Sequence, residues 1–154
     1  MKKICPGFTL IELLVTISII GVLFGIGVAK FNEFNRRQIL DQAAQELKSN
    51  LRLAQDKALA GEKPTGWCNQ PNQTLRGHQL RFGSSSRYLI EAVCSSGEPQ
   101  EVKSVVLPST VTGPNGTSVL FKVLAQGVDG ATTITLSGYG ETRPVMVTTT
   151  GEIK

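Results

Sequence analysis

Histidine is nearly absent from this chain of 154 residues, in which His78 is the only one. Around it the sequence shows neither a Ser/His/Asp order nor the glycine-flanked serine of a nucleophile elbow. Cysteine is scarce too, with three residues and no Cys-x-x-Cys pair that could begin a metal site. We therefore expect neither enzymatic activity nor a cofactor.

Charge and proline are missing from a second part of the chain, between Phe8 and Ala29, where Glu12 is the one exception. As a helix rising ~1.5 Å per residue, this segment would reach about 33 Å and could cross the hydrocarbon core of a membrane. A carboxylate within a membrane costs roughly 2.5 to 3.5 kcal/mol on insertion scales, so such acids are usually paired and functional. We predict a transmembrane helix at residues 8–29 in which Glu12 has a specific partner; the alternative is a side chain that reaches the interface at the helix end.

A short basic leader, residues 1–7, precedes this helix. Its lysines are typical of a secretory signal, but the cleavage site of such a signal follows the apolar region. Here the small residue Gly7 comes before the apolar region. Cleavage after Gly7 would therefore remove the leader and leave the mature protein in the membrane.

The run Gly7-Phe8-Thr9-Leu10-Ile11-Glu12 resembles the processing motif of the type IV pilin and type II secretion pseudopilin superfamily. The resemblance implies cleavage after Gly7 by a prepilin peptidase, N-methylation of Phe8 and use of Glu12 in subunit assembly. Its implied partners are other pilins or pseudopilins, the peptidase and methylase, and an inner-membrane assembly platform. The implied location is the bacterial inner membrane, with the head outside the cytoplasm, and then a periplasmic or extracellular filament.

The new amine of Phe8 could pair with Glu12 of the same subunit or with that of a neighbour. Pairing with a neighbour would favour assembly, because packing would then relieve the cost of burying the carboxylate.

Residues 30–60 continue as an amphipathic helix. Its apolar stripe recurs at spacings of three and four residues, at Leu40, Ala43 or Ala44, Leu47, Leu51, Ala54 and Ala58. Gly61 and Pro64 indicate the end of the helix. Residues 61–154 then show short β-type runs at 78–82, 88–94, 102–107, 119–124, 132–136 and 145–149. We predict an α+β fold in which the second half of one long helix packs against a head of antiparallel β-sheet.

Two cysteines remain if Cys5 leaves with the leader. Because the head is expected outside the cytoplasm, we predict a disulfide between Cys68 and Cys94; two separate thiols are the alternative. Metal binding by these cysteines with His78 is disfavoured by their wide spacing. Trp67, in the loop at residues 61–77, is expected to be a packing anchor, and a binding role is its alternative.

Five basic residues of the head could form one basic face: Arg76, Arg81, Arg87, Arg143 and Lys154. The superfamily includes minor subunits that take up DNA, so DNA binding through this face is the alternative function. Strand alternation would also point such side chains outward as ordinary surface charge. The net charge of +4 falls to 4 − 2 = +2 if Lys2 and Lys3 leave with the leader, which does not by itself indicate nucleic-acid binding.

Two further segments, residues 46–55 and 145–153, resemble the minor-subunit group that includes the H-type pseudopilins and related minor type IV pilins. We therefore expect a structural subunit, and a minor one, of a type IV pilus or a pilus-like secretion filament. A major pilin, a minor pilin and a pseudopilin share the same kind of anchor, and the sequence does not separate them.

Overall fold

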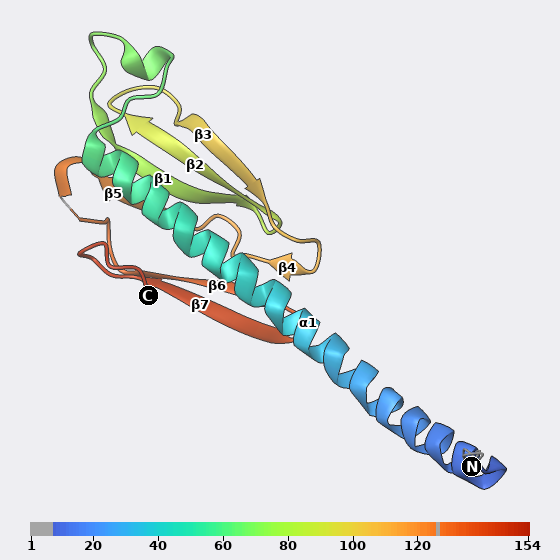
Figure 1. Cartoon of the computed structure of the whole chain (residues 1–154). Helices are drawn as coiled ribbons and strands as arrows, with labels where there is room; N and C mark the ends of the chain where they lie inside the picture. Colours follow the sequence, from blue (N-terminus) through green and yellow to red (C-terminus); the bar gives the residue numbers. More distant parts are fainter. Residues whose placement is uncertain (1–7, 126) are drawn as a thin grey trace, which may run out of the picture. The chain divides into compact units, whose positions relative to one another are not determined.

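The computed structural model describes residues 8–125 and 127–154. The predicted leader, with Cys5 and Gly7, lies outside the described residues. One long helix, α1 (Leu10–Ala60), is followed by antiparallel sheets (Figure 1). The chain forms two compact units whose boundary falls within α1, between Arg36 and Arg37. The second half of the helix therefore belongs to the same compact unit as the sheets.

The helix ends where the sequence predicts, at Gly61. The backbone N–H of Glu62 donates to the carbonyl of Lys57 (3.1 Å), and that of Gly61 donates to the carbonyl of Ala58 (3.2 Å). These two bonds form a Schellman motif, which requires a left-handed residue after the helix. Gly61, with a φ of +63°, adopts this conformation without the steric strain of a side chain.

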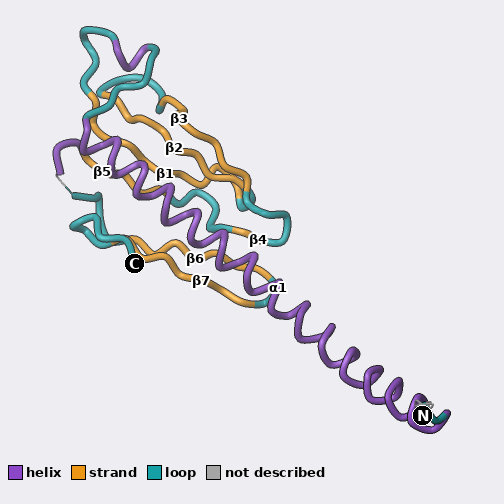
Figure 2. Tube along the Cα trace, viewed as in Figure 1, coloured by secondary structure: helices purple, strands orange, loops and turns teal. Residues whose placement is uncertain are grey.

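The strands form two sheets (Figure 2). The first has the order β3-β2-β1-β5 and contains β1 (Leu75–Ser84), β2 (Arg87–Cys94), β3 (Gln100–Val106) and β5 (Ser118–Lys122). The second has the order β4-β6-β7 and contains β4 (Val111–Thr112), β6 (Thr132–Gly138) and β7 (Glu141–Val147). All neighbouring strands in both sheets are antiparallel. Two short 3-10 helices, η1 (Trp67–Asn69) and η2 (Val123–Ala125), lie in the connections.

All six predicted strands are present, but several boundaries were wrong. The strand expected at 119–124 ends at Lys122, because the chain turns into η2 and Leu124 adopts a left-handed φ of 55°. The strand expected at 145–149 is β7, which begins four residues earlier, at Glu141, and ends at Val147. The loop expected to reach Gly77 ends sooner, because β1 begins at Leu75. The two-residue strand β4 was not predicted.

The core of the head lies between the apolar stripe of α1 and both sheets. In the view of Figure 1, strands β1, β2 and β3 lie on one side of this part of α1, and β6 and β7 lie on the other. The buried helix residues are Leu40, Ala43, Ala44, Leu47, Leu51, Ala54 and Ala58, and the sheets contribute Leu80, Phe82, Tyr88, Ile90, Val119, Phe121, Ile134, Leu136, Val145 and Val147. The predicted stripe is thus confirmed. Each fully buried leucine contributes roughly 1.5 to 3 kcal/mol.

Outer edges of the two sheets are partly protected. The register of β3 against β2 shifts between Ile90 and Glu91, which marks a bulge in the edge strand. On the other sheet, Met146 of β7 and Lys154 of the C-terminal tail exchange two backbone hydrogen bonds, of 3.1 and 2.9 Å. The tail therefore covers part of the β7 edge.

Candidate functional site

The N-terminal half of α1 has the properties of a membrane anchor. In the part of the chain that the structure describes, α1 is the one helix long and apolar enough to cross a membrane, and none of its most apolar stretch is buried inside the protein. Large apolar side chains are exposed along it, among them Leu10, Ile11, Ile20, Leu23 and Phe24. This surface needs a lipid or protein environment to cover it.

Two hydroxyl groups within this apolar stretch are satisfied by the helix itself. The Thr16 hydroxyl donates to the carbonyl of Leu13 and the Ser18 hydroxyl to that of Leu14, each at 2.8 Å. Hydroxyls without such partners would be costly in hydrocarbon. Neither residue therefore prevents insertion of the helix.

Glu12 lies in the first turn of α1, where Thr9 caps the helix. The Glu12 backbone N–H donates to the Thr9 hydroxyl oxygen (3.3 Å), and the Leu13 N–H donates to the Thr9 carbonyl (3.2 Å). Thr9 is thus the N-cap, and Glu12 occupies the acidic position of a capping-box spacing. The positive end of the helix dipole also favours a carboxylate there. This cap was not predicted from the sequence, although the Thr-x-x-Glu spacing is typical of one.

Phe8 precedes the cap and lies outside the helix, with 74% of its surface exposed. Residues four apart face each other only when both belong to the helix. The helix was predicted to begin at Phe8, and α1 begins two residues later, at Leu10. Gly7, on the other side of the expected cleavage site, is outside the described residues.

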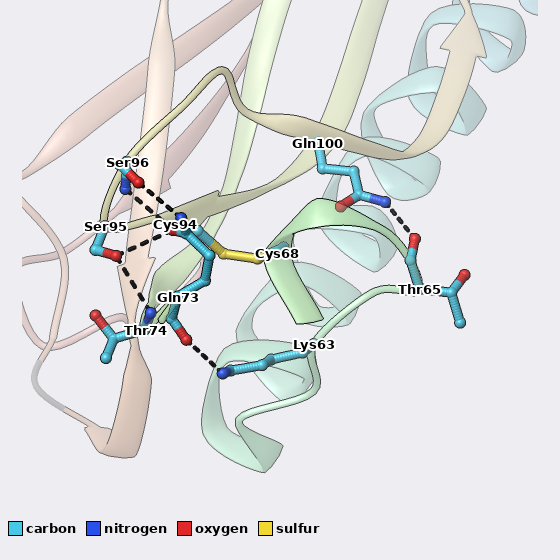
Figure 3. Close-up of a disulfide and its surroundings, with 9 residues drawn as sticks. All are labelled: Lys63, Thr65, Cys68, Gln73, Thr74, Cys94, Ser95, Ser96 and Gln100. Carbon is cyan, nitrogen blue, oxygen red and sulfur yellow. Dashed lines mark hydrogen bonds between the residues drawn. A yellow bond between two sulfur atoms is a disulfide. The ribbon is translucent and has the colours of Figure 1, made fainter. Parts of the chain in front are cut away.

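Within the head, a disulfide joins Cys68 in η1 to Cys94 at the end of β2 (Figure 3), with 5.9 Å between their Cα atoms. Both cysteines are buried. Because their sulfur atoms are bonded to each other, they are not available as ligands beside His78. The side chain of Trp67, expected as a packing anchor, is outside the described part of the structure.

Hydrogen bonds fix the same loop to the ends of β2 and β3. The Gln73 amide oxygen accepts from the Ser95 hydroxyl (3.1 Å), and the Gln73 amide nitrogen donates to the Ser96 hydroxyl (2.7 Å). Gln100 donates to the carbonyl of Thr65 (2.5 Å) (Figure 3). The loop between α1 and β1 is therefore attached to the sheet by these hydrogen bonds in addition to the disulfide.

Arg81 is bound to a buried carboxylate and is not an unpaired surface cation. Its guanidinium donates to both oxygens of Glu91, at 3.0 and 2.5 Å, and Gln79 donates to the same carboxylate at 2.7 Å. Burial alone would raise the pKa of Glu91, but the hydrogen bonds from Arg81 and Gln79 outweigh it and lower the pKa.

The other four basic candidates lie on both sheets and on the tail. Arg143 on β7 is paired with Asp41 (2.5 Å) and Glu141 (3.3 Å). Lys154 is paired with Glu152 (3.3 Å). Arg76 on β1 and Arg87 on β2 are exposed, and no carboxylate partner is found for either within residues 8–125 and 127–154.

His78 is enclosed in the core of the head, where it is 1% exposed and lies on β1 between Ala92 and Phe121. Its Nδ1 atom has no hydrogen-bond partner among the described atoms. Burial lowers its pKa, and the positive charge of Lys57 adds to this effect. The histidine is therefore held in its neutral form near pH 7.

Comparisons with known proteins agree with the interpretation of the anchor. Residues 2–28 match the family model described as the prokaryotic N-terminal methylation motif. The comparisons with curated proteins and with solved structures found no match. The motif and the exposed apolar helix that carries it support a type IV pilin-like subunit with an N-terminal membrane anchor.

Proposed function

We propose that this protein is a minor structural subunit of a type IV pilus or a pilus-like secretion filament. In this proposal it is processed after Gly7, N-methylated at Phe8 and assembled through its N-terminal helix. The observation that carries the proposal is the apolar half of α1, which matches the methylation motif and has no cover from the rest of the protein. Lipid would cover this helix before assembly, and neighbouring anchors would cover it in the filament.

Glu12 pairs with the N-terminus of a neighbouring subunit in this proposal. Cleavage would make the amine of Phe8 terminal, and such amines are mostly protonated at neutral pH. Phe8 lies just before the first residue of α1, so helical spacing alone does not fix its position against Glu12 of the same chain. A partner from the next subunit would neutralise the carboxylate only when the two anchors pack together.

The test replaces Glu12 by Gln, with Glu12→Asp as a charge-retaining control. Mass spectrometry first shows whether each variant begins at a methylated Phe8. Immunoblots of purified filaments then give the fraction incorporated, which we expect to fall at least about tenfold in Glu12→Gln, equivalent to ~1.4 kcal/mol. Normal incorporation of a correctly cleaved Glu12→Gln chain would refute the pairing.

The minor status of the subunit rests on two segments that resemble the minor group, residues 46–55 and 145–153. The structure supports treating them together, because the Gln55 side chain of the first donates to the Gly151 carbonyl of the second (3.1 Å). Quantitative mass spectrometry of purified filaments tests this part of the proposal. We expect a small share of the subunits, and a share close to that of the main component would contradict it.

DNA binding remains the second candidate, and it is favoured by Arg76 and Arg87, which are exposed cations without a carboxylate partner within the described residues. The full chain in detergent micelles would be tested for retardation of DNA at rising salt. Phosphate contacts predict an affinity that falls with log salt at a slope of about −0.9 per phosphate neutralised. No retardation at low salt would remove this candidate.

A further inference from the structure

A hollow of about 360 Å³ lies on the face of the four-stranded sheet that points away from the core. It is located where β1 begins and β5 ends, and its lining residues are Leu75, Arg76, Leu120, Lys122 and Val123. Leu120 and Lys122 alternate along β5 with the buried Val119 and Phe121, so their side chains point outward. A volume of this size is within the range of sites that bind small ligands or short peptide segments, roughly 300 to 1,000 Å³.

The lining combines apolar walls with two cations. Leu75, Leu120 and Val123 are half-buried and provide the walls. Arg76 has no carboxylate partner in the described part of the chain. Lys122 has an exposed partner, Asp129, at 2.5 Å, and exposed ion pairs of this kind are weak enough to exchange for another anion.

Leu124, the residue after the lining of the hollow, has an unusual backbone conformation. It follows Val123 directly, has a left-handed φ of 55°, and leaves 75% of its surface exposed. A leucine rarely adopts this backbone conformation, and strained residues are concentrated at binding and functional sites. A strained and exposed apolar residue therefore directly follows the lining residue Val123 in the chain.

We propose that this hollow binds an acidic peptide segment of a partner protein, in which a carboxylate lies next to a leucine or a similar apolar residue. The two cations complement the carboxylate, and the three apolar walls cover the apolar side chain. Single-stranded nucleic acid is less well suited, because its sites usually stack bases on aromatic side chains and the hollow has none. The proposal concerns the head and does not depend on assembly through the anchor.

The experiment uses the full chain in nanodiscs of zwitterionic lipid and three fluorescein-labelled peptides. One contains the run Leu-Asp-Leu-Glu, the second replaces the acids by amides, and the third replaces the leucines by serines. Fluorescence polarisation measures the dissociation constants. We expect the first peptide to bind more tightly than both others, because it alone has the carboxylates and the apolar side chains.

Variants then locate the site. We expect Arg76→Gln and Lys122→Gln each to weaken binding of the first peptide about two- to fivefold, as for exposed charge pairs. Arg87→Gln makes the same charge change on β2, outside the hollow, and should leave binding unchanged. A photoreactive leucine in the peptide should cross-link to β5 or to residues 75–76. Thermal melting confirms that the variants remain folded.

Three outcomes would overturn the proposal. One is equal binding of all three peptides or no binding of any of them. Another is an equal loss of affinity in Arg87→Gln, which would show general charge attraction. The third is a single-stranded DNA oligonucleotide that displaces the peptide and responds to the same two variants, which would identify a nucleic-acid site. None of these outcomes bears on the Glu12 test of filament assembly.

Discussion

The side-chain amide of Asn50, on α1, donates a hydrogen bond of 2.8 Å to the hydroxyl of Tyr88, on β2, inside the core of the head. The Asn50 oxygen accepts a second bond from Lys103 of β3 (2.9 Å). Burial raises the pKa of Tyr88 to about 12. A helix displaced along the sheet would leave these buried polar groups unpaired, so the bonds specify how α1 is positioned against β2 and β3.

Replacement of Asn50 by Leu is expected to lower the free energy of unfolding of the head by about 1 to 3 kcal/mol, because the Tyr88 hydroxyl would remain buried without a partner. Thermal unfolding of the full chain in detergent micelles, followed by near-ultraviolet circular dichroism, measures the change. Tyr88→Phe is the matched variant on the other side of the bond. We expect the double variant to cost less than the sum of the two single ones, and strict additivity would show that the bond contributes nothing.

Loss of the disulfide should destabilise the head. The bond between Cys68 and Cys94 spans 26 residues of sequence. In the chain-entropy description a loop of this length corresponds to about 3.5 kcal/mol. We expect the Cys68→Ser, Cys94→Ser variant to melt at a lower temperature and the amides of residues 61–74 to exchange faster with deuterium. Unchanged exchange in that loop would mean that the Gln73 and Gln100 contacts hold it without the bond.

Stability should depend on pH through His78, the only histidine in the chain. Burial keeps its folded-state pKa below the ordinary value of 6.5, so the unfolded chain binds the proton more readily. The contribution of His78 to the free energy of unfolding is then greatest above pH 6.5 and declines as the pH falls through that value. Below the folded-state pKa this contribution no longer changes. The melting temperature of His78→Leu should not show this decline, and an equal decline in that variant would exclude His78 as its source.

Glu91 should make the stability of the head depend on pH in a lower range than His78 does. Its folded-state pKa lies below the ordinary value of 4.5, so its contribution is present above pH 4.5 and is lost as the pH falls through the folded-state value. Glu91→Gln should therefore flatten the stability curve below pH 4.5 and leave the step near pH 6.5 in place. Melting curves from pH 3 to 8 would separate the two groups.

Gly151→Ala is expected to destabilise the contact between the tail and α1. Gly151 has a φ of +88°, and a Cβ atom there would meet the Gln55 amide nitrogen at 2.9 Å. Gly116 is the matched control, with a φ of +74° and open space around its Cβ position. Both changes add backbone strain of about 1 kcal/mol or more, whereas Gly151→Ala alone also disturbs Gln55. Equal melting temperatures would indicate that the Gln55 contact is unimportant.

The local pattern of residues was enough to predict much of this fold. A spacing of three and four residues identified Leu40, Leu47 and Leu51 as one buried face, because residues at this spacing lie on the same side of a helix. Gly61 indicated the helix end for an equally local reason. The processing motif identified Glu12 and Phe8 as residues of interest without any information from the head.

Contacts between distant parts of the chain could not be predicted in this way. Asn50 and Tyr88 are 38 residues apart, and nothing in either neighbourhood indicates the other. Strand β4 has two residues, which is too short to show alternation. Arg81 was expected to point outward, and its pairing with the buried Glu91 depends on the register of β1 and β2. Such features depend on which elements become neighbours, and periodicity alone contains no information on that.

The bulge in β3 and the tail on β7 also limit how the heads of separate chains can meet. Anchored chains share one membrane plane, where heads would meet at high local concentration, and bare strand edges under such conditions join into aggregates. Here the bulge interrupts the regular edge of β3, which also has the charged residues Glu101 and Lys103, and Lys154 occupies part of the β7 edge. Crowded heads would therefore have fewer open backbone groups to share at these two edges, so encounters there should stay brief and reversible.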